Sequence, residues 1–488
     1  MAKRVSVIDI GSNSVRMVIY EKTSRFAFHL LHEEKSKVRI SESAYQHDGV
    51  LQEIPMQRTF DALENFLKIS ESFKVKKVLC VATSALRDAP NRQEFIQRVR
   101  NTLKLNIKII SGEREAYFGA IACANLLPKQ SDAMSIDIGG GSTEITFIDA
   151  NNVSHTQSLK LGTVRLKELF FDKDDLKGAK EYIKKELQKI PSKEISTLIG
   201  IGGTYRAISS AIQKSQSYPL KKLHAFETTQ EVFIPYLENI LKADEQKLSD
   251  LYIDNNRFDV IKPGALILKM IISKFAIDKF ITSGVGVREG VYLADLLRSS
   301  KDQFPANYNT SVRYILDAHL SDKHFSNNLA TLTKHLFSIT QEYFGLDSSF
   351  KQQLTIAAKL YPSGSNIHFY SQNKHSYYIA QTALEYGFTH QDITLISTLM
   401  KYAKNKLPAK SHLEKYQRLL PQESVVNSLS FILSLGITLL NHRPRNIDLE
   451  LSFKNGILEV KSQSNLYLAK ESIAKLQCLK DFQVVFNS

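Results

Sequence analysis

The chain has 488 residues, too many for one hydrophobic core, and at about 150 residues a domain it would form roughly three domains. Its composition of 43% hydrophobic and 23% charged residues argues against a disordered or fibrous chain. The net charge of +14 favours a polyanionic partner, and three scattered cysteines argue against a disulfide framework or a zinc ribbon.

The first part of the chain, residues 1–125, alternates strand and helix patterns. Apolar residues at helical spacing predict three helices, and short buried runs predict strands between them. The predicted helices are 56–73, 91–103 and 113–127, and the predicted strands are 5–11, 16–22, 28–40, 75–83 and 107–112. Such alternation is typical of an α/β fold.

The same pattern begins again after Pro128 and fills residues 126–299. Strands are predicted at 135–141, 143–149, 153–162, 197–203 and 279–284, and helices at 177–190, 204–213 and 291–300. In both parts a strand ends in a glycine turn and a second strand follows at once, as VIDIGSNS at 7–14 and SIDIGGGSTE at 135–144. We interpret the two parts as copies of one architecture.

The last part, residues 300–488, has few glycines and a different texture. Helical spacing dominates from residue 312 to residue 442, and the segment 447–463 predicts a β-hairpin with an Asn-Gly turn. A helix and a strand are expected after it. The predicted domains are therefore 1–125, 126–299 and a mostly helical 300–488.

The repeated glycine turns predict phosphate binding. A turn without Cβ atoms lets backbone N–H groups approach phosphate oxygens closely. Side-chain donors stand beside them, and Asp9 and Asp137 end the preceding strands, where a carboxylate would hold Mg²⁺ beside a phosphate. The expected phosphate ligands in the two turns are Ser12, Asn13, Ser14, Gly139, Gly140, Gly141, Ser142 and Thr143. Two such turns facing each other would hold one phosphate chain from both sides.

A third turn, LIGIGGTYRA at 198–207, has the same character. Gly202, Gly203 and Thr204 lie between a predicted strand and the start of a helix, where the helix dipole favours anions. A plain tight turn with a capping acid is the alternative for any one of these loops taken alone.

Six motifs in order resemble those of the exopolyphosphatase/guanosine pentaphosphate phosphohydrolase family. They are VIDIGSNS, TSALRDA, ISGEREAYFGA, SIDIGGGSTE, IGIGGT and SGVGVREGV, and they cover about residues 3–299. The resemblance implies two duplicated actin-like (ribonuclease H-like) domains around a cleft. There, water would attack the terminal phosphate of inorganic polyphosphate, or of pppGpp to give ppGpp, with the help of Mg²⁺.

The resemblance also implies roles for charged residues in these motifs. Glu115 corresponds to the glutamate that positions and deprotonates water, although the nearby Glu113 is an alternative two positions away. Glu144 corresponds to a second catalytic glutamate, which would also bind metal with Asp9 and Asp137. Arg87 and Arg288 correspond to arginines that face the cleft and stabilise the transferred phosphoryl group.

In longer members of the family the third domain resembles a helical HD-type phosphohydrolase fold. Tyr361 and Pro362 stand where a metal-binding pair is expected, and neither can serve as a ligand. The nearby histidines are expected to be packing or surface residues: His324, His335, His368 and His375. We interpret this domain as a basic helical extension that binds long substrate or mediates dimerisation.

The resulting prediction is a Mg²⁺-dependent hydrolase acting on polyphosphate or pppGpp, with Mn²⁺ as an ion that the same oxygen ligands accept. A homodimer is a family-based expectation, and no DNA partner is expected. No apolar run approaches the ~18 residues of a membrane span, and the chain starts in a strand, so a cytoplasmic protein without membrane partner is expected. An ATP-dependent small-molecule kinase and a non-enzymatic actin-like ATP switch are the alternatives on this fold.

Overall fold

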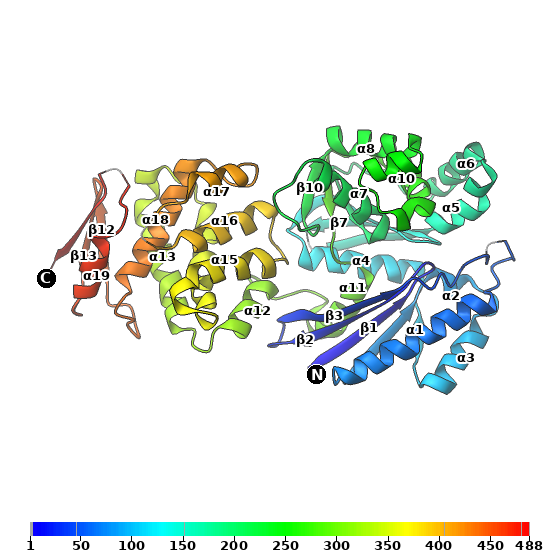
Figure 1. Cartoon of the computed structure of the whole chain (residues 1–488), viewed down its shortest axis with the longest axis horizontal. Coiled ribbons are helices and arrows are strands. Elements are labelled where there is room, and N and C mark those ends of the chain that lie inside the picture. Colours follow the sequence, from blue (N-terminus) through cyan, green and yellow to red (C-terminus); the bar gives the residue numbers. More distant parts are fainter. Residues whose placement is uncertain (1–2, 45, 151, 405, 480, 488) are drawn as a thin grey trace. The chain divides into compact units, whose positions relative to one another are not determined.

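The computed structural model describes residues 3–44, 46–150, 152–404, 406–479 and 481–487. The chain forms two compact units, Met1–Tyr308 and Asn309–Ser488, which are described separately below (Figure 1). Within the described ranges, no helix is both long enough and apolar enough for a membrane span.

The first sheet of the N-terminal unit has five strands in the order β3-β2-β1-β4-β5. Their bounds are β1 Arg4–Ile10, β2 Val15–Lys22, β3 Phe28–Ser36, β4 Lys77–Ala82 and β5 Ile107–Ile109. Helices α1 Glu53–Ser72, α2 Ser84–Asp88 and α3 Arg92–Leu103 connect them. Apolar side chains of β1, β2 and β4 pack against α1 and α3, and this core fixes where the first glycine turn leaves the sheet.

The second sheet has six strands in the order β10-β11-β9-β6-β7-β8. Its strands are β6 Gln130–Ile138, β7 Thr143–Ala150, β8 Asn152–Leu159, β9 Thr197–Ile201, β10 Phe226–Thr229 and β11 Lys279–Thr282. Its helices are α5 Thr163–Leu169, α6 Leu176–Leu187, α7 Gly202–Ser215, α8 Gln230–Lys242, α9 Glu245–Asp250 and α10 Phe258–Ile272. The sequence patterns predicted no element between 214 and 278, where β10, α8, α9 and α10 lie.

The two sheets repeat one topology, as the sequence predicted. In the first, β1 pairs antiparallel with β2 and parallel with β4. In the second, β6 pairs antiparallel with β7 and parallel with β9. The strand order β3-β2-β1-β4-β5 therefore corresponds to β8-β7-β6-β9-β11, with β10 added at one edge. The α/β fold with two duplicated domains is confirmed.

Two helices with small residues join the sheets. Helix α4 (Gly112–Leu126) packs against β6, β7 and β8 and against α11 (Val287–Leu296), which also contacts β1. A Cβ on Gly290 of α11 would lie 1.9 Å from the carbonyl oxygen of Phe118 in α4. This backbone contact requires glycine, and it sets the position of the first turn of α4.

The C-terminal unit is mostly helical, as predicted. It contains α12 Thr310–His319, α13 His324–Phe344, α14 Phe350–Leu360, α15 Gln372–Ala383, α16 His390–Tyr402, α17 Lys410–Lys415, α18 Glu423–Leu439 and α19 Tyr467–Ile473. A three-stranded sheet is formed by β12 Glu450–Lys454, β13 Ile457–Lys461 and β14 Gln483–Asn487. Asn455 and Gly456 have φ values of 48° and 82°, the positive angles that an Asn-Gly hairpin turn needs.

The residues predicted to replace a metal-binding pair have structural contacts. The carbonyl oxygen of the buried Tyr361 accepts hydrogen bonds from Gln372 Nε2 at 3.1 Å and from Ser376 Oγ at 2.6 Å. His368 is exposed. Among the described residues, no group of three or more His, Cys, Asp or Glu side chains is arranged to hold a metal ion. The role of this unit stays a prediction.

Replacing Gly290 with alanine will destabilise the N-terminal unit by about 1–3 kcal/mol, because the new Cβ must push apart the backbones of α11 and α4. The matched variant Gly119→Ala adds a Cβ on α4 that meets only the flexible end of Ile201, at 3.3 Å. Alanine is more favourable than glycine in a helix by about 1 kcal/mol, which offsets the small steric cost. The stability of Gly119→Ala will therefore stay close to that of the parent protein. Thermal unfolding measures the stability of both variants. An equal loss of stability in the two variants would contradict the close packing of α11 against α4 at Gly290.

Candidate phosphate-binding and catalytic site

The two glycine turns have the same geometry and face each other. The Gly11 N–H donates to Ser14 O at 3.2 Å, and the Gly139 N–H donates to Ser142 O at 2.9 Å. A Cβ on Gly140 would lie 3.0 Å from the Cβ of Ser12, so the turns are in van der Waals contact. A side chain at Gly140 would crowd the opposite turn, so the glycine serves this close approach.

Between the turns lies a cavity of about 150 Å³, roughly ten times the ~10–15 Å³ that one water molecule needs. Most of the predicted site residues line it: Asp9, Ser12, Asn13, Ser14, Glu115, Asp137, Gly139, Gly140, Ser142, Glu144, Gly202, Gly203, Thr204 and Arg288. Three predicted residues do not belong to its lining, namely Arg87, Gly141 and Thr143.

Thr143 and Gly141 are engaged elsewhere. The Thr143 hydroxyl donates to Leu161 O at 2.6 Å, and Gly141 O accepts from Arg165 Nε at 2.8 Å. Neighbouring residues on a strand point to opposite faces, so Thr143 points away when Glu144 faces the cavity. These two residues shape the second turn and do not line the cavity.

The two duplicated hairpins carry different charges at equivalent positions. Asp9 lies opposite Arg16 in the β1–β2 register, whereas Asp137 lies opposite Glu144 in the β6–β7 register. All four side chains line the cavity. The first hairpin therefore sets a carboxylate opposite a cation, whereas the second sets two carboxylates opposite each other. The two hairpins thus differ in the charge that they present to the cavity.

The third turn closes the same cavity. Gly202 has a φ of +82°, and a Cβ there would lie 2.3 Å from Asp137 Oδ1, so only glycine fits. Helix α7 begins at Gly202, and its first residues line the cavity with Thr204 almost fully buried. The free N–H groups of this helix start point a partial positive charge at the site.

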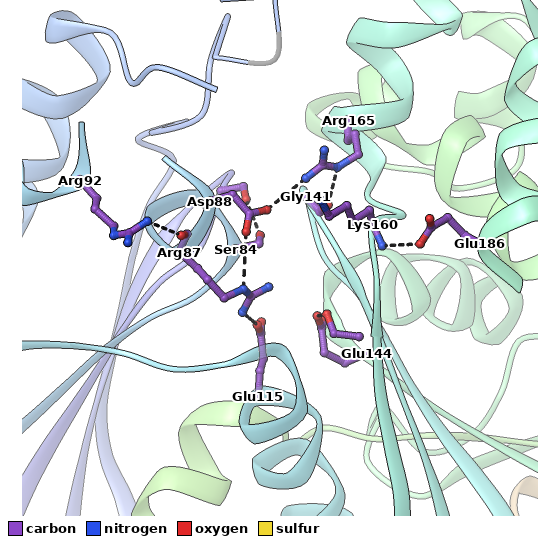
Figure 2. Close-up of polar contacts among 12 residues, drawn as sticks. Ser84, Arg87, Asp88, Arg92, Glu115, Gly141, Glu144, Lys160, Arg165 and Glu186 are labelled. Carbon is purple, nitrogen blue, oxygen red and sulfur yellow. Dashed lines mark hydrogen bonds and ion pairs between the residues drawn. The ribbon is translucent and has the colours of Figure 1, made fainter. Parts of the chain in front are cut away.

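Glu115 lies in the first turn of α4, which the Ser111 side chain caps by accepting from Arg114 N. Its carboxylate is buried and accepts a hydrogen bond from Arg87 Nη1 at 3.0 Å, as Figure 2 shows. Burial, and then the nearby carboxylate of Glu144, raise the pKa of Glu115 well above its ordinary value, although Arg87 opposes this. Glu113 is exposed and does not line the cavity.

Glu144 projects from β7 towards the same space as Glu115 (Figure 2). Its side chain is almost fully buried and accepts a hydrogen bond from Ser158 Oγ at 2.8 Å. Burial and the charge of Asp137 raise the pKa of Glu144 to about 7. Two buried carboxyl groups with raised pKa values in one cavity are typical of a functional site rather than a structural one.

Asp9 and Asp137 also occupy low-dielectric surroundings. Burial raises the pKa of Asp9 to about 6, and burial raises the pKa of Asp137 as well. In the described structure, Asp9 Oδ1 is buried without a hydrogen-bond partner. A buried carboxylate oxygen is costly to leave unpaired, so this atom suits a cation bound together with a phosphate.

Arg288 reaches the cavity from the start of α11, as predicted. Its Nη1 lies 2.6 Å from Glu33 Oε1, and its side chain is 8% exposed. Its neighbour Glu289 accepts from Tyr20 Oη at 2.5 Å and from Gly286 N at 2.7 Å. These contacts hold the arginine against the wall beside Asp9.

Sequence reasoning missed several residues that line the cavity: Arg16, Lys35, Thr83, Ser84, Thr163, Arg206, Arg257 and Glu289. Arg16 could have been found, because it stands at the position that Glu144 has in the other hairpin. Arg206 donates to the carbonyls of Ser283 and Val285 and comes from α7. It lies within the third turn segment, residues 198–207, whereas Lys35 and Arg257 lie in stretches with no signal of their own.

Comparisons with known proteins show the family and support the fold. Residues 18–299 match the sequence model of the Ppx/GppA phosphatase family, and residues 309–480 match that of Ppx/GppA phosphatase, domain III. A similar structure is the crystal structure of the Aquifex aeolicus member of the Ppx/GppA family. The similarity covers 62% of this chain and 99% of the Aquifex chain, with a TM-score of 0.54 and 29% sequence identity. An exopolyphosphatase from Cytophaga hutchinsonii, 23% identical, has the same fold over 62% of this chain and 100% of its own, with a TM-score of 0.57.

Two relatives were identified by sequence. The guanosine-5'-triphosphate,3'-diphosphate pyrophosphatase of Aliivibrio fischeri is 25% identical over 94% of this chain and 92% of its own length. The bifunctional 3-dehydroquinate synthase/phosphatase of Fusobacterium nucleatum is 31% identical over 57% of this chain. The matched region is 44% of the Fusobacterium protein, so this chain spans less than half of the length of that relative.

The raised pKa of Glu144 predicts a pH-dependent gain in stability for the variant Glu144→Gln. A carboxyl group whose pKa is about 7 when folded and 4.5 when unfolded binds its proton more tightly in the folded state. The free energy of unfolding therefore falls as the pH rises between these values. The variant escapes this loss, so above pH 7 it will be more stable than the parent by about 1–3 kcal/mol.

Thermal unfolding near pH 4.5 and at pH 8, in buffer without Mg²⁺ or phosphate, measures this difference. The two proteins should converge near pH 4.5. The variant Glu113→Gln, at an exposed position, serves as the control and should follow the parent at both pH values. A stability difference for Glu144→Gln that is the same at both pH values would contradict the burial of this carboxyl group.

Proposed function

Because the chain belongs to the Ppx/GppA phosphatase family, we propose that it is a Mg²⁺-dependent phosphoanhydride hydrolase. Its substrate would be inorganic polyphosphate, from which it releases the terminal phosphate, or pppGpp, from which it releases the 5' γ-phosphate. The observation that carries this proposal is the contact of two glycine turns around one cavity with Glu115 and Glu144 in its wall.

The turns supply the binding of the terminal phosphate. Residues of the two turns and of the start of α7 line the cavity. The proposed donors are their backbone N–H groups, except those of Gly11 and Gly139, which bond within the turns, together with the hydroxyls of Ser12 and Ser142. The guanidinium groups of Arg16, Arg206 and Arg288 add positive charge in a partly desolvated space, where it acts more strongly than in water. Such fixed donors need no reorganisation as charge develops on the transferred phosphoryl group.

Glu115 is the residue proposed to orient water and accept its proton. It lies in the cavity wall, and Arg87 holds its carboxylate at 3.0 Å. A carboxylate with a raised pKa is a stronger base once it has lost its proton, which suits water activation near neutral pH. Phosphoryl transfer depends mainly on positioning and electrostatics, so one such base beside fixed cations is a sufficient constellation.

The residues present fit a divalent cation that is shared with the substrate. Mg²⁺ commonly takes one or two carboxylates and completes its shell with phosphate oxygens and water. Asp9, whose buried Oδ1 has no partner in the described structure, would hold it, with Asp137 or Glu144 from the same cavity as a second ligand. Among the described residues no three such side chains are arranged to hold an ion by themselves, so phosphate oxygens and water would complete its shell. When bound, the ion would neutralise phosphate charge. Mn²⁺ accepts the same ligands.

Phosphate release from polyphosphate, pppGpp and ATP with Mg²⁺ tests the proposed activity. Release from polyphosphate or pppGpp with little from ATP is expected. The variant Glu115→Gln should lower kcat by about a hundredfold or more, since a general base contributes at least this much, while substrate binding persists. Glu113→Gln is the matched control, an exposed glutamate two residues away, and should keep parent activity. ATP consumption that depends on an added sugar would contradict the proposal and favour a kinase.

Removal of divalent cations by EDTA should abolish phosphate release, and Mg²⁺ should restore it. The variant Asp9→Asn should need a higher Mg²⁺ concentration for half-maximal activity, because it loses the charge of the proposed ligand. The variant Asp132→Asn changes an exposed aspartate on β6 and should leave this concentration unchanged. An unaltered Mg²⁺ requirement for Asp9→Asn would remove Asp9 from the proposed metal site.

A further inference from the structure

Exposed aromatic rings gather in one short segment of the C-terminal unit. Within the described ranges, five aromatic side chains stay exposed, and three of them lie in residues 369–378. They are Phe369, Tyr370 and Tyr378, which are 68%, 80% and 64% exposed. Each ring carries a large apolar area whose burial is favourable, so rings that gather on one surface indicate a place where a partner binds.

The backbone beneath these rings is held in place by side-chain hydrogen bonds. Two 3₁₀ turns lead into α15 here, and Ser376 of that helix donates to Tyr361 O at 2.6 Å and accepts from the Gly364 N–H at 3.0 Å. After the second turn begins, Tyr370 O accepts from Lys404 Nζ at 3.0 Å. The rings therefore project from a fixed backbone, which lowers the entropy cost of binding a partner.

The segments that carry and support the rings are basic and contain no acid. Residues 361–384 and 393–413 hold five lysines and three histidines but neither aspartate nor glutamate. The two segments contribute α15 and most of α16, which pack side by side in the C-terminal unit (Figure 1). Among the described residues, no acid lies within ion-pair distance of the exposed lysines of this region: Lys374, Lys404, Lys406 and Lys410.

Two of these lysines stand directly among the rings. Lys374 and Tyr378 are four residues apart on α15, so they lie on one face of the helix. Tyr370 precedes Lys374 by the same four residues, and its carbonyl oxygen contacts Lys404. Rings and cations thus alternate on what we call the aromatic–lysine face: Phe369, Tyr370, Lys374, Tyr378 and Lys404.

The chemistry of this face selects one kind of partner. A bare phosphate chain would neutralise the lysines but has no flat group to cover the rings, and an apolar surface would cover the rings but leave the lysines without a counter-charge. A single-stranded nucleic acid offers both, because its backbone carries phosphates and its unpaired bases stack on aromatic side chains. In a duplex the faces of the bases are already stacked on one another.

We propose that the aromatic–lysine face of the C-terminal unit binds single-stranded nucleic acid, with bases stacked on its rings and backbone phosphates against its lysines. This function is separate from phosphate release, since the face belongs to the C-terminal unit and the catalytic carboxylates belong to the N-terminal unit.

Fluorescence anisotropy of labelled oligouridylate and oligothymidylate, each about 20 nucleotides long, tests the proposal with the full-length protein. Tyr378→Ala should weaken binding about tenfold, as expected for the loss of one stacked base, and Tyr378→Phe, which keeps the ring, should bind as the parent. Lys374→Ala should lower the slope of log affinity against log salt concentration by about 0.7, the value of one phosphate contact on a single strand. Binding of either strand supports the proposal, and the tighter one identifies RNA or DNA as its source.

Tyr467→Ala is the matched control. Tyr467 on α19 is a tyrosine of the same unit with the same exposure of 64%, but it lies outside the two acid-free segments and four residues from Glu471. This variant should bind both strands as the parent does. Equal affinities of the parent and Tyr378→Ala would overturn the proposal, and so would equal losses in Tyr378→Ala and Tyr467→Ala.

Two further measurements check other occupants of the face. A changed oligomeric state of Tyr378→Ala in sedimentation, with unchanged oligonucleotide affinity, would overturn the proposal and assign the face to a second copy of the chain. Parent binding to phosphatidylglycerol vesicles that Tyr378→Ala loses, without oligonucleotide binding by either protein, would overturn it in favour of a membrane surface. Phosphate release from tripolyphosphate should be the same in Tyr378→Ala and the parent, so the proposed hydrolase activity and this binding function succeed or fail separately.

Discussion

The contact between Gly140 and Ser12 is the constraint on which the rest of the N-terminal unit depends. It brings the glycine turns of two duplicated sheets within van der Waals distance, so that their N–H groups and hydroxyls border one small cavity. The position of α4 follows from a second backbone contact, between Gly290 and Phe118, and it carries Glu115 into the same space. A Cβ at Gly290 would collide with the backbone of α4, and one at Gly140 would crowd Ser12. Duplication thus gives two similar walls, and close packing turns them into one site.

The two walls have diverged in charge at equivalent positions. Where the second hairpin has Glu144 opposite Asp137, the first has Arg16 opposite Asp9. Burial raises the pKa of Asp9 to about 6 and that of Glu144 to about 7, so without a ligand these groups reduce stability near neutral pH. Such local strain is typical of a site that awaits a charged ligand and a cation.

The fold and the centre of the site could be predicted because local rules determine them. Strand–glycine turn–strand patterns gave both hairpins, and Asn455-Gly456 gave the terminal hairpin. The period of two along β7 could have excluded Thr143, whose hydroxyl donates to Leu161 O. Lys35 and Arg257 could not be found, because only tertiary packing brings these unremarkable positions to the cavity. Arg206, by contrast, lies in the turn segment 198–207 and could have been named. Arg87 stands in a recognisable motif, yet it contacts Glu115 instead of lining the cavity.

The most direct measurement of the central claim is a crystal structure of the Glu115→Gln protein with Mg²⁺ and tripolyphosphate. The account predicts that N–H groups from both the Gly11–Ser14 and the Gly139–Ser142 turns contact the terminal phosphate. It also predicts that a water molecule lies between the phosphorus atom and the side chain at position 115. A terminal phosphate bound by one turn alone, or bound outside the cavity, would contradict the account.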